Sequence, residues 1–186
     1  MRERQEASED AFITRIGQAV MLLHGGDREE ARNRFGELWT ELGEAGDAFH
    51  RCALAHYLAD TQDDPGDELA WDLRALTAAD GLGESAADGG AAEVRGDDDR
   101  GDDGGAGGDR LAEARESVPG TSSVVRAFYP SLHLNLAADY LKLQRPEAAR
   151  LHLDRARDAA DALGDGGDVN GVRAGIDRLE RLLRER

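Results

Sequence analysis

Lysine, cysteine and long apolar runs are nearly absent from this chain. Lys142 is the only lysine and Cys52 the only cysteine among 186 residues, so no intramolecular disulfide can form. No apolar run approaches the roughly 20 residues of a membrane-spanning helix. The charged N-terminal segment Met-Arg-Glu-Arg-Gln-Glu lacks the apolar core of a signal peptide. These absences predict a cytoplasmic protein that does not enter a membrane.

Acidic residues outnumber basic ones, and the formal net charge is −16. The stretch from Asp88 to Asp109 holds eight acidic residues and two arginines, a net of −6, which leaves −10 on the remainder. A nucleic-acid binder needs a basic face that neutralises phosphates, and an anionic membrane makes the same demand. The charge therefore argues against both partners and favours a neutral or basic protein or peptide.

Glycine and aspartate are concentrated in one internal segment, residues 81–122. A segment with so few large apolar side chains cannot bury enough surface to offset the entropy lost on ordering. We therefore predict one domain in three parts. Residues 1–80 form two helix pairs, residues 81–122 form a flexible acidic loop, and residues 123–186 form a third pair with a final helix.

Outside that loop, apolar residues recur at three- and four-residue steps, the spacing of an α-helix with one buried face. No alternating strand pattern is present, so the predicted fold is all-α. Pro130 is expected to interrupt the fifth helix near its start. The predicted helices cover about residues 8–24, 27–42, 47–61, 65–80, 124–143, 146–163 and 169–184.

The first and third helix pairs share five positions separated by three, nine, four and three residues. These are Ala19, Leu22, Ala31, Phe35 and Leu38 in the first pair, and Ala137, Tyr140, Ala149, Leu153 and Ala156 in the third. Small residues at two of the positions let antiparallel helices approach closely, while larger residues fill the space one turn later. The middle pair fits poorly, because only Leu69, Leu73 and Leu76 keep part of the spacing and its first helix is out of register.

This spacing resembles the tetratricopeptide repeat, and the chain is similar to actinobacterial proteins of that class. Arg15 and His133 stand where the family commonly has a tryptophan. The resemblance implies antiparallel helix pairs stacked as a short right-handed solenoid, closed by a C-terminal capping helix. It also implies a non-catalytic module, without cofactor or metal ion, that binds a peptide or protein.

In the family the first helix of each pair lines a groove. Carried over by position, the lining is Ile13, Ile16, Val20, Leu23 and His24 in the first pair, and Ser131, Leu134, Asn135, Ala138, Leu141 and Lys142 in the third. Asn135 resembles an asparagine that in some relatives binds a peptide backbone or terminal carboxylate. The apolar members can also simply pack against neighbouring helices, and that alternative stays open.

A catalytic alternative rests on Cys52, His56 and Asp60, which share one helical face. A Cys–His pair can activate a thiolate, but a zinc site would need a second ligand set that the sequence lacks. The run after Asp97 fails as a calcium loop, because Asp102 stands where the turn glycine belongs and Gly108 where the bidentate glutamate belongs.

The sequence thus favours a protein-interaction module. A peptide- or ligand-sensing regulator that acts through a separate effector is the first alternative, since no DNA-binding or nucleotide motif is visible. An enzyme that uses Cys52 and His56 is a weaker one. The identity of the partner and the oligomeric state stay open.

Deleting most of residues 89–108 tests the loop assignment. We expect the free energy of unfolding to change by less than about 1 kcal/mol, because loop-closure entropy grows only with the logarithm of loop length. Thermal unfolding of the deleted and parent chains gives the comparison, and a fall of many degrees in the deleted chain would contradict the assignment.

Overall fold

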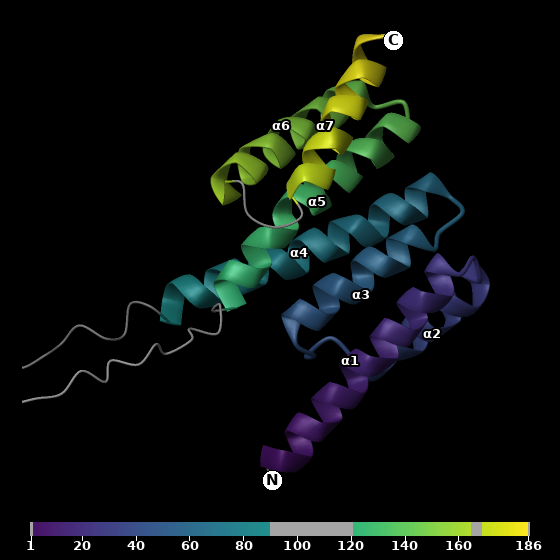
Figure 1. Cartoon of the computed structure of the whole chain (residues 1–186), viewed down its shortest axis with the longest axis vertical. Coiled ribbons are helices and arrows are strands. Elements are labelled where there is room, and N and C mark those ends of the chain that lie inside the picture. The colour runs from purple at the N-terminus through teal and green to yellow at the C-terminus, as the bar shows by residue number, and fades with distance from the viewer. Residues whose placement is uncertain (1, 90–120, 165–168, 186) are drawn as a thin grey trace, which may run out of the picture.

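The computed structural model describes residues 2–89, 121–164 and 169–185. Within these ranges it contains seven α-helices and no strand, which confirms the predicted all-α fold (Figure 1). The helices are α1 (Arg2–His24), α2 (Arg28–Leu42), α3 (Ala48–Asp60), α4 (Pro65–Gly89), α5 (Thr121–Lys142), α6 (Pro146–Leu163) and α7 (Val169–Arg184). None of the helices in these ranges has both the length and the apolar composition to cross a membrane.

Each helix packs against the next one along the chain, and α7 also contacts α5 (Figure 1). The three pairs α1–α2, α3–α4 and α5–α6 therefore form a stack, with α7 laid over the last pair. The first and third pairs turn in the same way. Asp27 N donates to Leu22 O at 3.0 Å, and Arg145 N donates to Tyr140 O at 2.8 Å. These bonds join equivalent positions, so the two pairs share backbone geometry as well as spacing.

The shared positions of the repeat form the centres of two apolar clusters. Ala31 and Phe35 are fully buried between α1, α2 and α3, and the Phe35 ring stacks on Tyr57 with centroids 5.4 Å apart. In the third pair α7 covers the equivalent cluster: its residues Ile176 and Leu183 pack against the buried residues at the α5–α6 interface. The buried members of the repeat are Ala19, Ala31, Phe35, Leu38, Ala137, Ala149, Leu153 and Ala156.

Two predicted boundaries differ from the structure. Helix α4 continues to Gly89 and α5 begins at Thr121, so residues 81–89 and 121–122 are helical and not part of a loop. Leu82 of α4 and Phe128 of α5 belong to one apolar cluster, and this packing extends both helices beyond their strong sequence signals. Residues 90–120, the remainder of the predicted loop, lie outside the described residues.

Pro130 does not interrupt α5, contrary to the sequence-based expectation. Its ring is buried, and the Ser131 hydroxyl donates to the Phe128 carbonyl at 3.0 Å. Burial of the proline ring offsets part of the cost of the backbone bond that a proline cannot make.

Ala149 is fully buried at the α5–α6 contact, as its place in the repeat predicted. Ala149→Leu should lower the free energy of unfolding by about 1–3 kcal/mol, because an enlarged side chain overpacks this contact. Ala162→Leu, at an exposed position of the same helix, is the matched control and should leave the melting temperature nearly unchanged. Equal melting temperatures for Ala149→Leu and the parent would mean that Ala149 does not lie at the α5–α6 interface.

Candidate functional site

The middle pair keeps the register of the other two but carries polar residues at the shared positions. Counting three, nine, four and three residues through α3 and α4 gives His56, Ala59, Glu68, Asp72 and Ala75. Pro65 and Pro146 then stand at the same place, the first residue of α4 and of α6. The expectation that the first helix of this pair is out of register is therefore wrong. Apolar periodicity does not reveal this register, because three of its five positions are polar.

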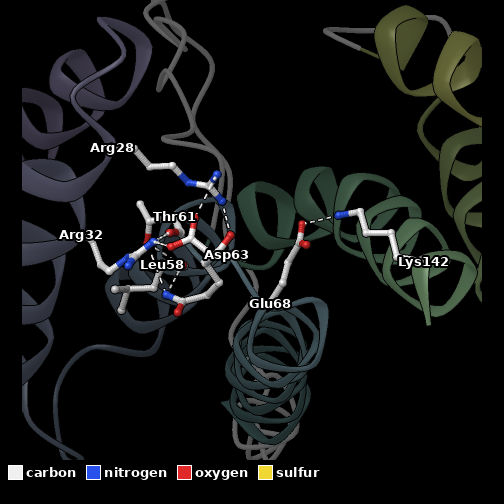
Figure 2. Close-up of polar contacts among 8 residues, drawn as sticks. Arg28, Arg32, Leu58, Thr61, Asp63, Glu68 and Lys142 are labelled. Carbon is white, nitrogen blue, oxygen red and sulfur yellow. Dashed lines mark hydrogen bonds and ion pairs between the residues drawn. The ribbon is translucent and has the colours of Figure 1, made fainter.

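These polar residues meet others from α5 in one cluster, which we call the polar site. Its members are His56, Asp60, Glu68, Asp72, Asn135, Asp139 and Lys142. The Lys142 ammonium group lies 2.6 Å from Glu68 Oε1 and 3.2 Å from Asp139 Oδ1, and Figure 2 shows the first of these contacts joining α4 to α5. His56 Nδ1 lies 3.2 Å from Asn135 Nδ2 and 3.7 Å from Asp72 Oδ1. The site thus joins three helices through hydrogen bonds and charge.

Two carboxyl groups lie at the bottom of the polar site. Asp72 and Asp139 are each only 1% exposed, and within the described part of the chain one oxygen of each is buried without a hydrogen-bond partner. Burial, together with the charges of Asp72 and Glu68, raises the pKa of Asp139 to about 8 despite the nearby ammonium group of Lys142. Leaving a buried polar atom unpaired costs about 1–3 kcal/mol, so this arrangement works against stability.

His56 connects the buried acids to the surface. Burial lowers its pKa, but the nearby carboxylates of Asp72, whose Oδ1 lies 3.7 Å from Nδ1, and of Asp60 outweigh burial, so the pKa of His56 is raised. A neutral His56 accepts from the Asn135 amide at Nδ1, whereas a protonated one directs Nδ1–H toward Asp72. The imidazole can therefore respond to a charge placed beside it.

The upper part of the site is open to solvent. The side chains of His56 and Glu68 are 23% and 20% exposed, and that of Lys142 is 45% exposed. Asp60 lies at the exposed rim, where partial burial and the charges of Asp72 and Glu68 raise its pKa. A partner can therefore contact the rim without entering the core.

Two arginines of α2 hold the α3–α4 turn beside the polar site. Arg32 Nε donates to the Thr61 carbonyl at 2.9 Å, and its Nη2 lies 2.7 Å from Asp63 Oδ2. Arg28 contacts the same turn (Figure 2). The buried Thr61 hydroxyl donates to the Leu58 carbonyl at 2.7 Å. These contacts fix the end of α3, and with it the positions of His56 and Asp60.

The residues expected to line a groove occupy different environments. Ile16 and Leu141 are buried in the two apolar clusters, and Val20, Leu23 and Leu134 pack against them. Leu134 also lies against α7, where a Cβ added to Gly175 would approach its Cδ2 atom to 2.6 Å. The other members are the exposed Ile13 and His24, the half-buried Ser131 and Ala138, and Asn135 and Lys142 of the polar site.

Cys52 lies in the apolar cluster between α3, α4 and α5. Burial, with a smaller contribution from Asp72, raises the pKa of the Cys52 thiol to about 12. The thiolate needed for nucleophilic attack is therefore disfavoured at neutral pH. In the described ranges, no three His, Cys, Asp or Glu side chains are grouped so that they could hold a metal ion.

His133 and His152 form a contact between α5 and α6. Their Nδ1 atoms lie 3.1 Å apart across α5 and α6, and the Tyr140 ring stacks on His152. Burial, followed by the charges of His152 and Arg155, lowers the pKa of His133 to about 4. Both rings fill the pair contact, so we assign them a structural role.

The chain matches no protein-family model, no curated protein and no solved structure.

Asp139→Asn tests the cost of the buried carboxyl group through pH. Because the pKa of Asp139 is higher in the folded chain than in the unfolded one, protonation of this group favours the folded state. That contribution to the free energy of unfolding is complete below the usual pKa of 3.8 and is lost as the pH rises through about 8. The amide does not titrate, so the advantage of Asp139→Asn over the parent should grow from near zero at low pH to the order of 1–3 kcal/mol in alkaline buffer.

The measurement is the melting temperature of both chains between pH 4.5 and 8.5. Asp158→Asn on the exposed face of α6 removes the same charge and should run parallel to the parent. His133 titrates in all three chains, so its effect on the melting temperature cancels when the chains are compared. A difference between Asp139→Asn and the parent that stays constant with pH would mean that Asp139 is not the titrating group.

Proposed function

We propose that this chain is a non-catalytic interaction module of the tetratricopeptide type that holds a basic peptide segment over the polar site. The observation that carries the proposal is the chemistry of the middle pair. His56, Glu68 and Asp72 occupy positions that hold alanine or a large apolar residue in the other two pairs. Apolar residues there would serve the fold better, because a buried polar cluster gains little or no stability over well-packed apolar side chains.

The charge of the polar site selects the partner. The carboxyl groups of Asp60, Glu68 and Asp72 lie around the single ammonium group of Lys142, and the Asp139 carboxyl group, with a pKa of about 8, adds its charge only in alkaline solution. A lysine or arginine side chain from a partner is attracted to this surplus, and arginine can bind a carboxylate through two parallel hydrogen bonds. The net charge of −16 on the whole chain adds long-range attraction for a basic segment.

In this proposal each rim residue has a role in binding. Asp60 and Glu68 face solvent and can pair with the basic side chain. Asn135 carries both a donor and an acceptor and can bind the peptide backbone once its contact with His56 rearranges. Lys142 is held by Glu68 and Asp139, so it stabilises the acids and is not free to receive a partner's carboxylate.

A peptide selection tests this function. A displayed library of random 12-residue peptides is selected against the intact chain, and the recovered sequences are synthesised and titrated by fluorescence anisotropy. We expect enrichment of lysine and arginine. The Asp60→Asn/Glu68→Gln double variant should bind the selected peptides at least about tenfold more weakly, a loss of 1.4 kcal/mol.

The matched control is Asp154→Asn/Asp158→Asn, which removes the same charge from exposed positions on α6. It should bind like the parent, and circular dichroism checks that each variant is folded. An equal loss of affinity in both double variants would mean that the peptides are attracted only by the overall negative charge of the chain and not by the polar site. Selection of acidic or purely apolar peptides would contradict the proposal.

A further inference from the structure

The first helix pair leaves open a face that is covered in the third pair. The repeat relates each residue of α1 and α2 to the residue 118 positions later in α5 and α6. Met21 thus corresponds to Asp139, yet Met21 is 75% exposed and Asp139 only 1%. Gln18 is exposed, while its equivalent Leu136 is fully buried. In the third pair α4 packs along this face, and in the first pair no described helix does.

The open face forms a groove of about 670 Å³ between α1 and α2. Its apolar part consists of the buried Ala19 and Leu38, the half-buried Leu22 and the exposed Met21. In the third pair the rings of His133 and His152 occupy the space that corresponds to the one between Arg15 and Arg34, and α4 packs against α5. The groove is therefore an unfilled apolar surface between α1 and α2, and its α1 side is the side that a helix covers in the third pair.

The charges at the rim indicate which helix it accepts. The groove is bordered by two basic residues, Arg15 and Arg34, and by three acidic ones, Asp27, Glu37 and Glu41. Its local net charge is −1, against −16 for the chain, so here two copies of this acidic chain can approach with little repulsion. Within one copy Arg15 pairs with Glu41 at 2.6 Å and Arg34 pairs with Glu30 at 2.8 Å. These exposed pairs can exchange partners with those of a second copy across a two-fold axis, as an isologous interface requires. A basic partner would instead be drawn to the more acidic polar site.

We infer that the α1–α2 groove is a homodimer interface, in which Met21 of each copy enters the groove of the other. The contact is reciprocal and closes on itself, so it gives a dimer and not a filament. It lies at the opposite end of the stack from α7 (Figure 1) and leaves the rim of the polar site open.

Sedimentation velocity of the full chain over about a hundredfold concentration range tests the inference. The parent should sediment as a dimer, and Met21→Glu should raise the dimer dissociation constant at least tenfold, because it places a carboxylate in the apolar part of the groove. Leu151→Glu, at a half-exposed position on α6, is the matched control and should dimerise like the parent. A monomeric parent would overturn the inference and leave the groove for a helix of another protein.

Chemical cross-linking gives a second measurement that does not depend on the stability of Met21→Glu. In Met21→Cys the new thiol is exposed, whereas Cys52 is buried, so a short bis-maleimide should join two copies through position 21. Leu151→Cys should give little cross-linked dimer under the same conditions. Equal yields from the two variants, or a dimer of Met21→Glu as tight as the parent's, would place the interface elsewhere.

Discussion

The close approach of the two helices within each pair is the constraint on which the rest of this structure depends. In the outer pairs alanines meet at the crossing, Ala19 with Ala31 and Ala137 with Ala149, and all four are buried. Their small size brings the helix backbones together and sets the spacing at which larger residues fill the next turn. Because the same spacing runs through all three pairs, each pair presents an equivalent face to its neighbour, and the pairs stack.

The polar site follows from that constraint. The middle pair keeps the spacing, so whatever stands at its shared positions is brought together by the fold. Here these residues are His56, Glu68 and Asp72, and the stacking of α5 adds Asn135, Asp139 and Lys142. The outer pairs supply the rigidity. The arginines of α2 fix the turn after α3, and α7 covers the apolar cluster of the third pair.

Much of the fold could be predicted from sequence, because it depends on local patterns. Apolar periodicity located all seven helices, and the repeat identified Ala149 as buried. The helical state of residues 81–89 and 121–122 could not be predicted, because the apolar periodicity is weak there and the apolar cluster that holds Leu82 of α4 and Phe128 of α5 joins segments distant in sequence. Lys142 and Asn135 were expected in a groove, but their partners Glu68 and His56 come from other helices. The signal that reveals the site is the repeat spacing, once polar residues are allowed at its positions.

The same logic accounts for the open α1–α2 groove. Each pair has two faces for stacking, and among the described helices only the outer face of the α1–α2 pair has no neighbour. The rim of that groove combines both signs of charge on an otherwise acidic chain. The two surfaces therefore differ in kind, with an acidic site in the middle of the stack and a nearly neutral one at its end.

The central claim is that the middle pair carries polar residues for binding at the expense of stability. The most direct measurement gives this pair the residues of the third pair, His56→Ala, Glu68→Ala and Asp72→Leu together, and records melting temperature and affinity for the selected basic peptides. The account predicts a variant that is more stable than the parent, by about 1–4 kcal/mol as for other buried charge clusters replaced by apolar residues, and that no longer binds. A less stable variant, or a more stable one that binds as the parent does, would contradict it.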